Sequence, residues 1–250
     1  MNYFFVILIG LCIGSFLNVC IYRIPEEQSI VFPPSHCMSC GYELRILDLF
    51  PVVSYIFLKG RCRGCGEKIS IQYPIIEFIN GLIYLLIYMQ NGYTLKTLGF
   101  MIFSSLMIVI AMIDFKTKFV YTSTIIFGFL VEVVFFIIQW VSKESFPKDR
   151  LIGMIIGVAV IGLIVITTRG MGEGDIEIAG ISGLLLGSKA TIFMLFSSFV
   201  IGGLVGVIYI VLKKKGRKDE MAFGPCLAIG TILSMFIGNQ VILAYINMYL

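Results

Sequence analysis

Long apolar runs recur along nearly the whole of the 250-residue chain, and they limit its possible folds more than any other feature. They cover residues 3–22, 74–90, 95–113, 119–141, 151–168, 176–188, 190–212 and 222–249. A helix needs about 20 apolar residues to cross the hydrocarbon core of a bilayer. Only 14% of the residues are charged and the mean hydropathy is +0.98, unlike a soluble domain. The sequence therefore predicts an all-α polytopic protein of the lipid bilayer, with about eight transmembrane helices.

The distribution of Lys and Arg predicts the orientation of these helices. Residues 3–22 lack a preceding basic segment and an Ala-x-Ala-like cleavage site, which favours an uncleaved first span over a signal peptide. With the N-terminus outside, 14 of the 19 basic residues fall on the cytoplasmic side, as the positive-inside tendency requires. These 14 include Arg169 and the cluster at 213–218. The net charge of +4 is thus explained by the orientation of the helices in the membrane, and no nucleic-acid partner is expected.

The sixth apolar run is short for a membrane crossing. Only 13 residues separate Asp175 from Lys189, which corresponds to roughly 20 Å of helix. A re-entrant segment would, however, place the basic cluster 213–218 outside. We therefore expect a crossing, with local thinning of the bilayer or with Asp175 below the membrane surface.

The one sizeable polar stretch, residues 23–73, carries two CxxCG motifs with 21 residues between them. Two residues between cysteines let both sulfurs face one tetrahedral ion, and the following glycine permits the tight turn. In a reducing compartment this pattern favours a structural zinc site over two disulfides or free thiols. The expected ligands are Cys37, Cys40, Cys62 and Cys65. His36 is expected to be a neighbour of this shell, and Cys12, Cys20 and Cys226 to be small core residues of the spans.

Acidic residues within or beside apolar runs are costly in a membrane, so each is a functional candidate. They are Glu77, Asp114, Glu132, Glu173, Asp175 and Glu177. Asp114 ends the third run and Asp175 begins the sixth, so the expected topology places both at the cytoplasmic face. Two such carboxylates can share a proton, one acting as general base toward water and the other as general acid toward a scissile carbonyl.

Other interpretations of these residues remain open at this point. Asp175 has the position of a helix N-terminal cap, and Asp114 lies near Lys116 and Lys118, with which it can form an interfacial ion pair. Glu132 is expected to be a polar contact within the membrane and Glu77 an interfacial group. The sequence GMGEGDIE at 170–177 is not a phosphate loop, because the GxxxxGK[ST] order is absent.

Four segments carry a resemblance to a known family. They are GSFLNVCIYRIP (14–25), PPSHCMSCGYEL (33–44), DLFPVVSYIFLKGRCRGCG (48–66) and ISIQYPIIEFING (69–81). Followed by Asp114 and by Gly172-x-Gly174-Asp175, they resemble the prepilin leader peptidases of type IV pilus, type II secretion and competence systems. The resemblance covers nearly the whole chain.

This resemblance implies an aspartic peptidase of a prokaryotic inner membrane, with Asp114 and Asp175 as its catalytic pair. It implies cleavage of prepilins or pseudopilins on the cytoplasmic side, between the leader and the mature apolar helix. It also implies N-methylation of the new amino terminus from S-adenosylmethionine, associated with the N-terminal region. The expected domains are a first helix at 1–22, a zinc-binding module at 23–73 and a peptidase core at 74–250.

The chain departs from the family pattern in two places. Glu177 stands where Lys is common, and 119–122 lacks the usual proline. An added negative charge makes full ionisation of the pair harder. Three alternatives remain: a peptidase without methyltransferase activity, an ion-coupled transporter, and an assembly factor with structural zinc. A transporter favours carboxylates near the bilayer midplane, and an assembly factor would tolerate their loss.

Overall fold

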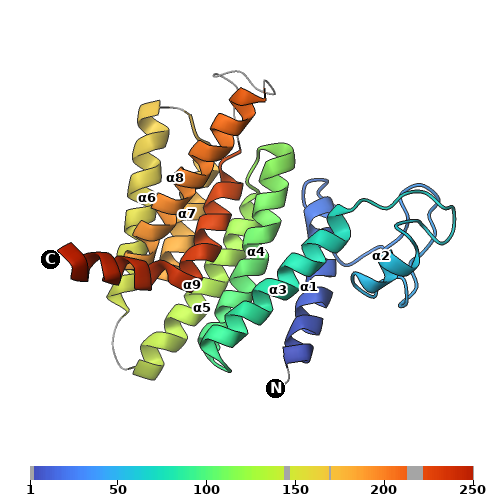
Figure 1. The fold of residues 1–250 in the computed structure, drawn as a ribbon, viewed down its shortest axis with the longest axis horizontal. Coiled ribbons are helices and arrows are strands. Elements are labelled where there is room, and N and C mark those ends of the chain that lie inside the picture. Colours follow the sequence, from blue (N-terminus) through green and yellow to red (C-terminus); the bar gives the residue numbers. More distant parts are fainter. Residues whose placement is uncertain (1–2, 144–146, 169, 213–221, 250) are drawn as a thin grey trace. The chain divides into compact units, whose positions relative to one another are not determined.

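The structure is a computed structural model that describes residues 3–143, 147–168, 170–212 and 222–249. Arg169 and the basic cluster 213–218, both used in the charge count, lie outside the described residues. The described residues form nine helices (Figure 1). They are α1 (Tyr3–Arg23), α2 (Val53–Phe57), α3 (Gln72–Asn91), α4 (Leu95–Thr117), α5 (Thr122–Lys143), α6 (Lys148–Thr168), α7 (Glu173–Leu186), α8 (Ser188–Val211) and α9 (Gly224–Tyr249). Apart from α2, they match the eight apolar runs to within four residues at each end.

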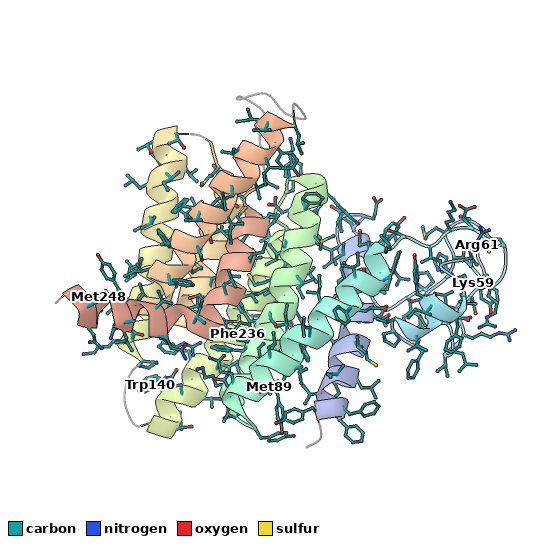
Figure 2. All side chains as sticks on the ribbon, viewed as in Figure 1. Lys59, Arg61, Met89, Trp140, Phe236 and Met248 are labelled. Carbon is teal, nitrogen blue, oxygen red and sulfur yellow. The ribbon has the colours of Figure 1, made fainter. Side chains whose placement is uncertain are left out.

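The helices confirm an all-α, multi-pass membrane protein. Seven of those described are long and apolar enough to cross a membrane. Large apolar side chains are exposed along them, among them Met89, Trp140 and Met248 (Figure 2), as expected of surfaces that face lipid. The remaining long-run helix, α7, has 14 residues and a length of about 21 Å, so it is too short to cross the hydrocarbon core alone.

The chain divides into two compact units, Met1–Val109 and Ile110–Leu250, and α4 contributes to both. In the first unit, α1 packs directly on α3. A Cβ added at Gly10 would lie 2.7 Å from the Cα of Gly81, and one at Gly14 would lie 2.6 Å from the Cα of Glu77. Glycines thus let the two backbones approach closely, as is common between membrane helices.

Three buried polar side chains form a row of hydrogen bonds beside this packing. The Asn80 amide donates to the Gly10 carbonyl at 2.7 Å and accepts from the Ser105 hydroxyl at 2.9 Å. The hydroxyls of Ser105 and Tyr84 lie 2.9 Å apart. All three side chains are buried, so their polar groups are satisfied within the protein rather than by water.

In the second unit, α7 lies against α6 through another set of small residues. A Cβ at Gly153 would lie 2.4 Å from the Gly183 carbonyl oxygen, and one at Gly157 would lie 2.4 Å from the Ala179 carbonyl oxygen. The Gly153-x-x-x-Gly157 spacing places both glycines on one face of α6. This close packing holds the short helix α7 along the side of a longer one.

Polar side chains at the start of α6 and in α5 hold the C-terminal end of α7. Arg150 donates to the Leu184 carbonyl at 2.7 Å and forms an ion pair with the fully buried Glu132. Asp149 accepts hydrogen bonds from the backbone N–H and the hydroxyl of Ser188, the first residue of α8. We call Glu132, Asp149 and Arg150 the polar clamp. The clamp satisfies helix-end groups that lipid could not.

Candidate active site and metal centre

Asp114 lies in the last turn of α4 with its side chain buried. Its carboxylate accepts a hydrogen bond of 2.9 Å from the backbone N–H of Gly224, where α9 begins. Among the described residues, neither Lys116 nor Lys118 forms an ion pair with this carboxylate. The interfacial ion pair left open by the sequence is therefore not formed.

Asp175 is the third residue of α7 and is also buried. Its carboxylate accepts the backbone N–H of Gly172 at 3.1 Å, and Gly172 is the residue that caps the helix. The prediction that Asp175 is the N-terminal cap is therefore wrong: Gly172 has that position, and Asp175 accepts the N–H of the cap residue from within the first turn. A carboxylate in a first helical turn is also favoured by the helix dipole.

The two aspartates approach each other closely enough to interact electrostatically. The buried thiol of Cys226, in the first turn of α9, interacts with both carboxylates. The ends of α4, α7 and α9 therefore meet at one point and bring two buried carboxylates together. Buried, interacting carboxylates of this kind are suited to share one proton.

Two glycines make this meeting sterically possible. A Cβ at Gly174 would lie 2.5 Å from the Cβ of Val120, and one at Gly224 would lie 2.5 Å from the Oδ2 atom of Asp114. At Gly172 the nearest contact is an ordinary 3.9 Å, and the backbone is extended. The close approach thus needs Gly174, which lies against the segment that lacks the family proline.

None of the other acidic candidates forms a hydrogen bond or ion pair with the two aspartates among the described residues. Glu173 and Glu177 are exposed on α7. Glu132 belongs to the polar clamp, and Glu77 accepts the Val52 backbone N–H at 2.7 Å.

The four cysteines of the two CxxCG motifs form a cluster that can hold a metal ion, with all four Sγ atoms within 4.8 Å of one another. The Sγ atoms of Cys37 and Cys65 lie 3.9 Å apart. A tetrahedral zinc ion with Zn–S bonds of about 2.3 Å separates its sulfurs by about 3.8 Å. The donor set and its spacing therefore fit zinc, and none of the described cysteines forms a disulfide.

The two motifs fold in the same way. Cys37 N–H donates to the Tyr42 carbonyl and Gly41 N–H to the Cys37 carbonyl; Cys62 and Gly66 repeat this pattern with Glu67. Gly41 and Gly66 both have positive φ, of 71° and 75°, a conformation that favours glycine. These matched turns aim backbone N–H groups at the sulfurs.

The thiols differ in how readily they ionise. Backbone N–H groups of Cys40 and Ser39 lower the pKa of Cys37 to about 6. For Cys65, the Glu67 N–H lowers the pKa, but the neighbouring sulfurs and desolvation outweigh it and raise the pKa to about 12. Four adjacent thiolates repel one another, and a bound cation removes that obstacle.

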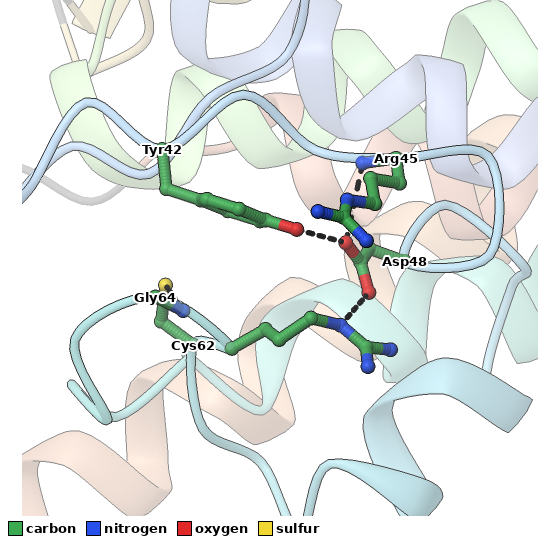
Figure 3. Close-up of polar contacts among 6 residues, drawn as sticks. Tyr42, Arg45, Asp48, Cys62 and Gly64 are labelled. Carbon is green, nitrogen blue, oxygen red and sulfur yellow. Dashed lines mark hydrogen bonds and ion pairs between the residues drawn. The ribbon is translucent and has the colours of Figure 1, made fainter.

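A side-chain network joins the two motifs. Asp48 accepts hydrogen bonds from Tyr42 at 3.2 Å and from the Arg45 backbone N–H at 3.2 Å, and it pairs with Arg63 at 2.7 Å (Figure 3). In the second motif, Gly64 N–H donates to the Cys62 sulfur at 3.3 Å. His36 is not part of the cluster and contacts the Pro34 carbonyl instead.

Sequence reasoning did not identify Gly224 or Cys226 as part of the carboxylate site. Cys20 and Cys226 are buried as expected, but the prediction that Cys12 is a core residue is wrong, because its side chain is on an exposed face of α1. The sequence does indicate where α9 begins, because Gly224-Pro225 at the start of an apolar run is typical of a helix N-terminus. The start of α9 can therefore be located from the sequence, but its contact with Asp114 cannot.

Comparison with known proteins covers most of the chain. The model of the Bacterial Peptidase A24 N-terminal domain matches residues 8–91, and that of the Type IV leader peptidase family matches residues 101–207. The prepilin leader peptidase/N-methyltransferase of Bacillus subtilis is 31% identical, over 96% of each chain. The type 4 prepilin-like proteins leader peptide-processing enzyme of Escherichia coli O78:H11 is 30% identical, over 91% of each chain. No solved structure matches the chain significantly.

Proposed function

Because the chain belongs to the type IV leader peptidase family, we propose that it is a bifunctional membrane enzyme that removes the leader peptide from prepilins and N-methylates the new amino terminus. The Bacillus subtilis relative carries both activities in its name, and its match covers 96% of the chain. We propose further that cleavage occurs at the cytoplasmic face of a prokaryotic inner membrane, with the N-terminus of the enzyme outside.

The observation that best supports the peptidase activity is the meeting of Asp114 and Asp175. Both carboxylates are buried, both accept one backbone N–H, and they interact with each other. Like charges in such a site disfavour double ionisation, so the resting pair would hold one proton. This state contains both a base and an acid, as hydrolysis of a peptide bond requires.

The chemistry follows from that shared proton. The ionised carboxylate takes a proton from a water molecule, which attacks the scissile carbonyl carbon, while the protonated carboxyl donates its proton to the carbonyl oxygen. As the C–N bond breaks, the first carboxyl passes the proton from water to the leaving amine, and the second carboxylate regains a proton from the intermediate as the new carboxyl group forms. This reaction requires no nucleophilic side chain, and Cys226 is proposed only to line the site.

A hollow beside the pair suits an apolar substrate segment. It has a volume of about 280 Å³ and adjoins Asp114 through Phe115 and Gly224 through Pro225. Its lining includes Phe115, Lys118, Ile201, Tyr209, Pro225 and Cys226. We propose that the start of the prepilin's mature helix enters here laterally from the bilayer, which would place the leader junction at the two aspartates.

For the cofactors, we propose one structural zinc ion and S-adenosylmethionine. Cys37, Cys40, Cys62 and Cys65 would hold the zinc, which would cross-link two turns too small to form a core of their own. S-adenosylmethionine would supply the methyl group, and the freed α-amino group would accept it. In the first unit, the amide oxygen of the buried Asn18 side chain has no hydrogen-bond partner among the described residues, which suits a ligand that carries an amino group.

In this proposal the functional domains are the first membrane helix at 1–22, the zinc-binding module at 23–73 and the peptidase core at 74–250. The zinc-binding module would be cytoplasmic, and the core would carry the aspartates.

The test is an assay of the purified enzyme with a prepilin and S-adenosylmethionine, followed by mass spectrometry of the product. We expect leader loss and a gain of about 14 Da, the mass of one methylene. Asp114→Asn and Asp175→Asn should each lower cleavage by about 10³-fold, within the range for loss of an acid or base. Glu67→Gln, at an exposed acidic residue of the other compact unit, is the matched control. Normal cleavage by either Asn variant would exclude the carboxylate mechanism and favour a transporter or an assembly factor.

A further inference from the structure

Within the zinc-binding module, residues 46–58 have the sequence ILDLFPVVSYIFL, which is almost entirely apolar. The structure leaves much of this stretch exposed: Ile46 is 85% exposed, Leu47 74%, Ile56 66% and Phe57 81%. Phe50 is also exposed. We call these five residues the apolar patch. Exposed apolar side chains gathered in this way are typical of a binding surface.

The charge within this stretch is turned away from the patch. Asp48 is the one charged residue of 46–58, and its side chain is only 2% exposed. It is held inside the module by Arg63, Tyr42 and the Arg45 backbone (Figure 3). The surface of the stretch is therefore uncharged and suits an apolar environment.

The module is attached beside a membrane helix rather than only at its end. The Val52 backbone N–H, next to α2, donates to Glu77 at 2.7 Å. Glu77 lies five residues into α3, or about 7.5 Å along a helix long enough to span a membrane. Figure 1 correspondingly shows α2 lower than the start of α3, toward the N-terminal end of α1.

The membrane helices at the two ends of the module also carry exposed apolar side chains. Tyr22 at the end of α1, Ile71 before α3, and Ile75 and Phe78 within α3 are all exposed. The module that carries the patch is thus joined at both ends to helices that would face lipid.

We propose that the apolar patch inserts into the headgroup–acyl boundary of the bilayer that α1 and α3 span, so that the zinc-binding module rests on the lipid surface. Lys59 and Arg61 follow α2 directly and are exposed, so they are available to anionic headgroups. Burying such side chains by about 5–10 Å is the usual mode of interfacial apolar segments. This inference requires only that α1 and α3 span the membrane, and it does not depend on the peptidase or methyltransferase activity.

The test uses tryptophan fluorescence of the full-length enzyme in bilayer nanodiscs. The chain has one tryptophan, so Trp140→Phe provides a silent background. In that background, Phe57→Trp and Ile46→Trp report on the patch, and Glu43→Trp reports on an exposed position outside it. Stoichiometric zinc in each variant would show that the module is folded.

We expect blue-shifted emission from both patch variants and strong quenching by lipids brominated near the headgroup. The Glu43→Trp variant should emit as a solvated tryptophan and be quenched several-fold less. Solvated emission from both patch variants would overturn the proposal. Blue-shifted emission without quenching by brominated lipid would also overturn it, because protein rather than lipid would then cover the patch.

Discussion

At the scale of single residues, the candidate site depends on the absence of a side chain as much as on the two carboxylates. Asp114 can accept the Gly224 N–H only because the glycine leaves room for its Oδ2 atom. Gly174 allows Val120 to approach α7 in the same way. The sequence motif around Asp175 predicts one of these glycines, whereas the need for Gly224 follows from a contact across 110 residues.

Gly224→Ala should impair cleavage without removing either aspartate. The new Cβ would lie 2.5 Å from the Oδ2 atom of Asp114, so the carboxylate must move away from its N–H partner. We expect kcat to fall by about tenfold or more, equivalent to about 1.4 kcal/mol of barrier, with little change in KM. Gly203→Ala is the matched control, since its Cβ would meet nothing within 4 Å. An unchanged kcat for Gly224→Ala would show that the observed Asp114 geometry is not the working one.

Asn18→Leu addresses the proposed methyl-donor region. The substitution keeps the side-chain size but removes the unpartnered amide oxygen. We expect methylation to fall at least about tenfold while leader cleavage is retained, measured as separate product masses from one reaction. Cys12→Ala, elsewhere on α1, is the control. Normal methylation by Asn18→Leu would remove Asn18 from the donor site.

At the scale of elements, α7 is the unusual helix. Its 14 residues are too few to cross the hydrocarbon layer, so we expect its last carbonyls to need partners that lipid cannot supply. Arg150 supplies one to Leu184, and the glycine contacts with α6 fix the helix along its length. Because Asp175 is near the other end of the same helix, we expect the polar clamp to help to position the carboxylate.

Variants of the polar clamp can separate positioning from folding. Arg150→Met alone leaves Glu132 buried and unpaired, which should cost about 3–5 kcal/mol of folding stability. Adding Glu132→Leu removes the orphaned charge and should restore much of the thermal midpoint. The double variant still lacks the hydrogen bond to the Leu184 carbonyl, so we expect its kcat to remain several-fold low. Full recovery of both the midpoint and kcat in the double variant would show that the clamp serves stability alone.

At the scale of the whole molecule, the sequence predicts the helices well because a bilayer permits few other structures. Apolar runs locate seven helices long enough to span a membrane and the shorter α7, and the expected alternation of their directions places Asp114 and Asp175 at one face. The regular CxxCG spacing likewise predicts the cysteine cluster. The contacts of Val120 and Cys226 could not be predicted, because they depend on how helix ends pack. The description of 23–73 as polar also fails for 46–58. The one charged residue of this segment is buried by contacts with residues outside it, which the composition of the segment does not reveal.

Removal of zinc should affect the two activities unequally, because the cysteine cluster and the aspartates belong to different compact units. Cys37→Ser or Cys62→Ser should each release the metal, since three thiolates and a hydroxyl bind zinc far more weakly than four thiolates. The zinc-binding module would then lose its cross-link, while Asp114 and Asp175 would keep the partners they have within Ile110–Leu250. We expect zinc content, measured by elemental analysis, to fall from one ion per chain to near zero.

Methylation should fall at least about tenfold more than cleavage, whereas Cys12→Ser, outside the cluster, should change neither. Stoichiometric zinc in both cluster variants would place the metal elsewhere, and an equal fall in both activities would mean that the zinc-binding module also supports the peptidase site.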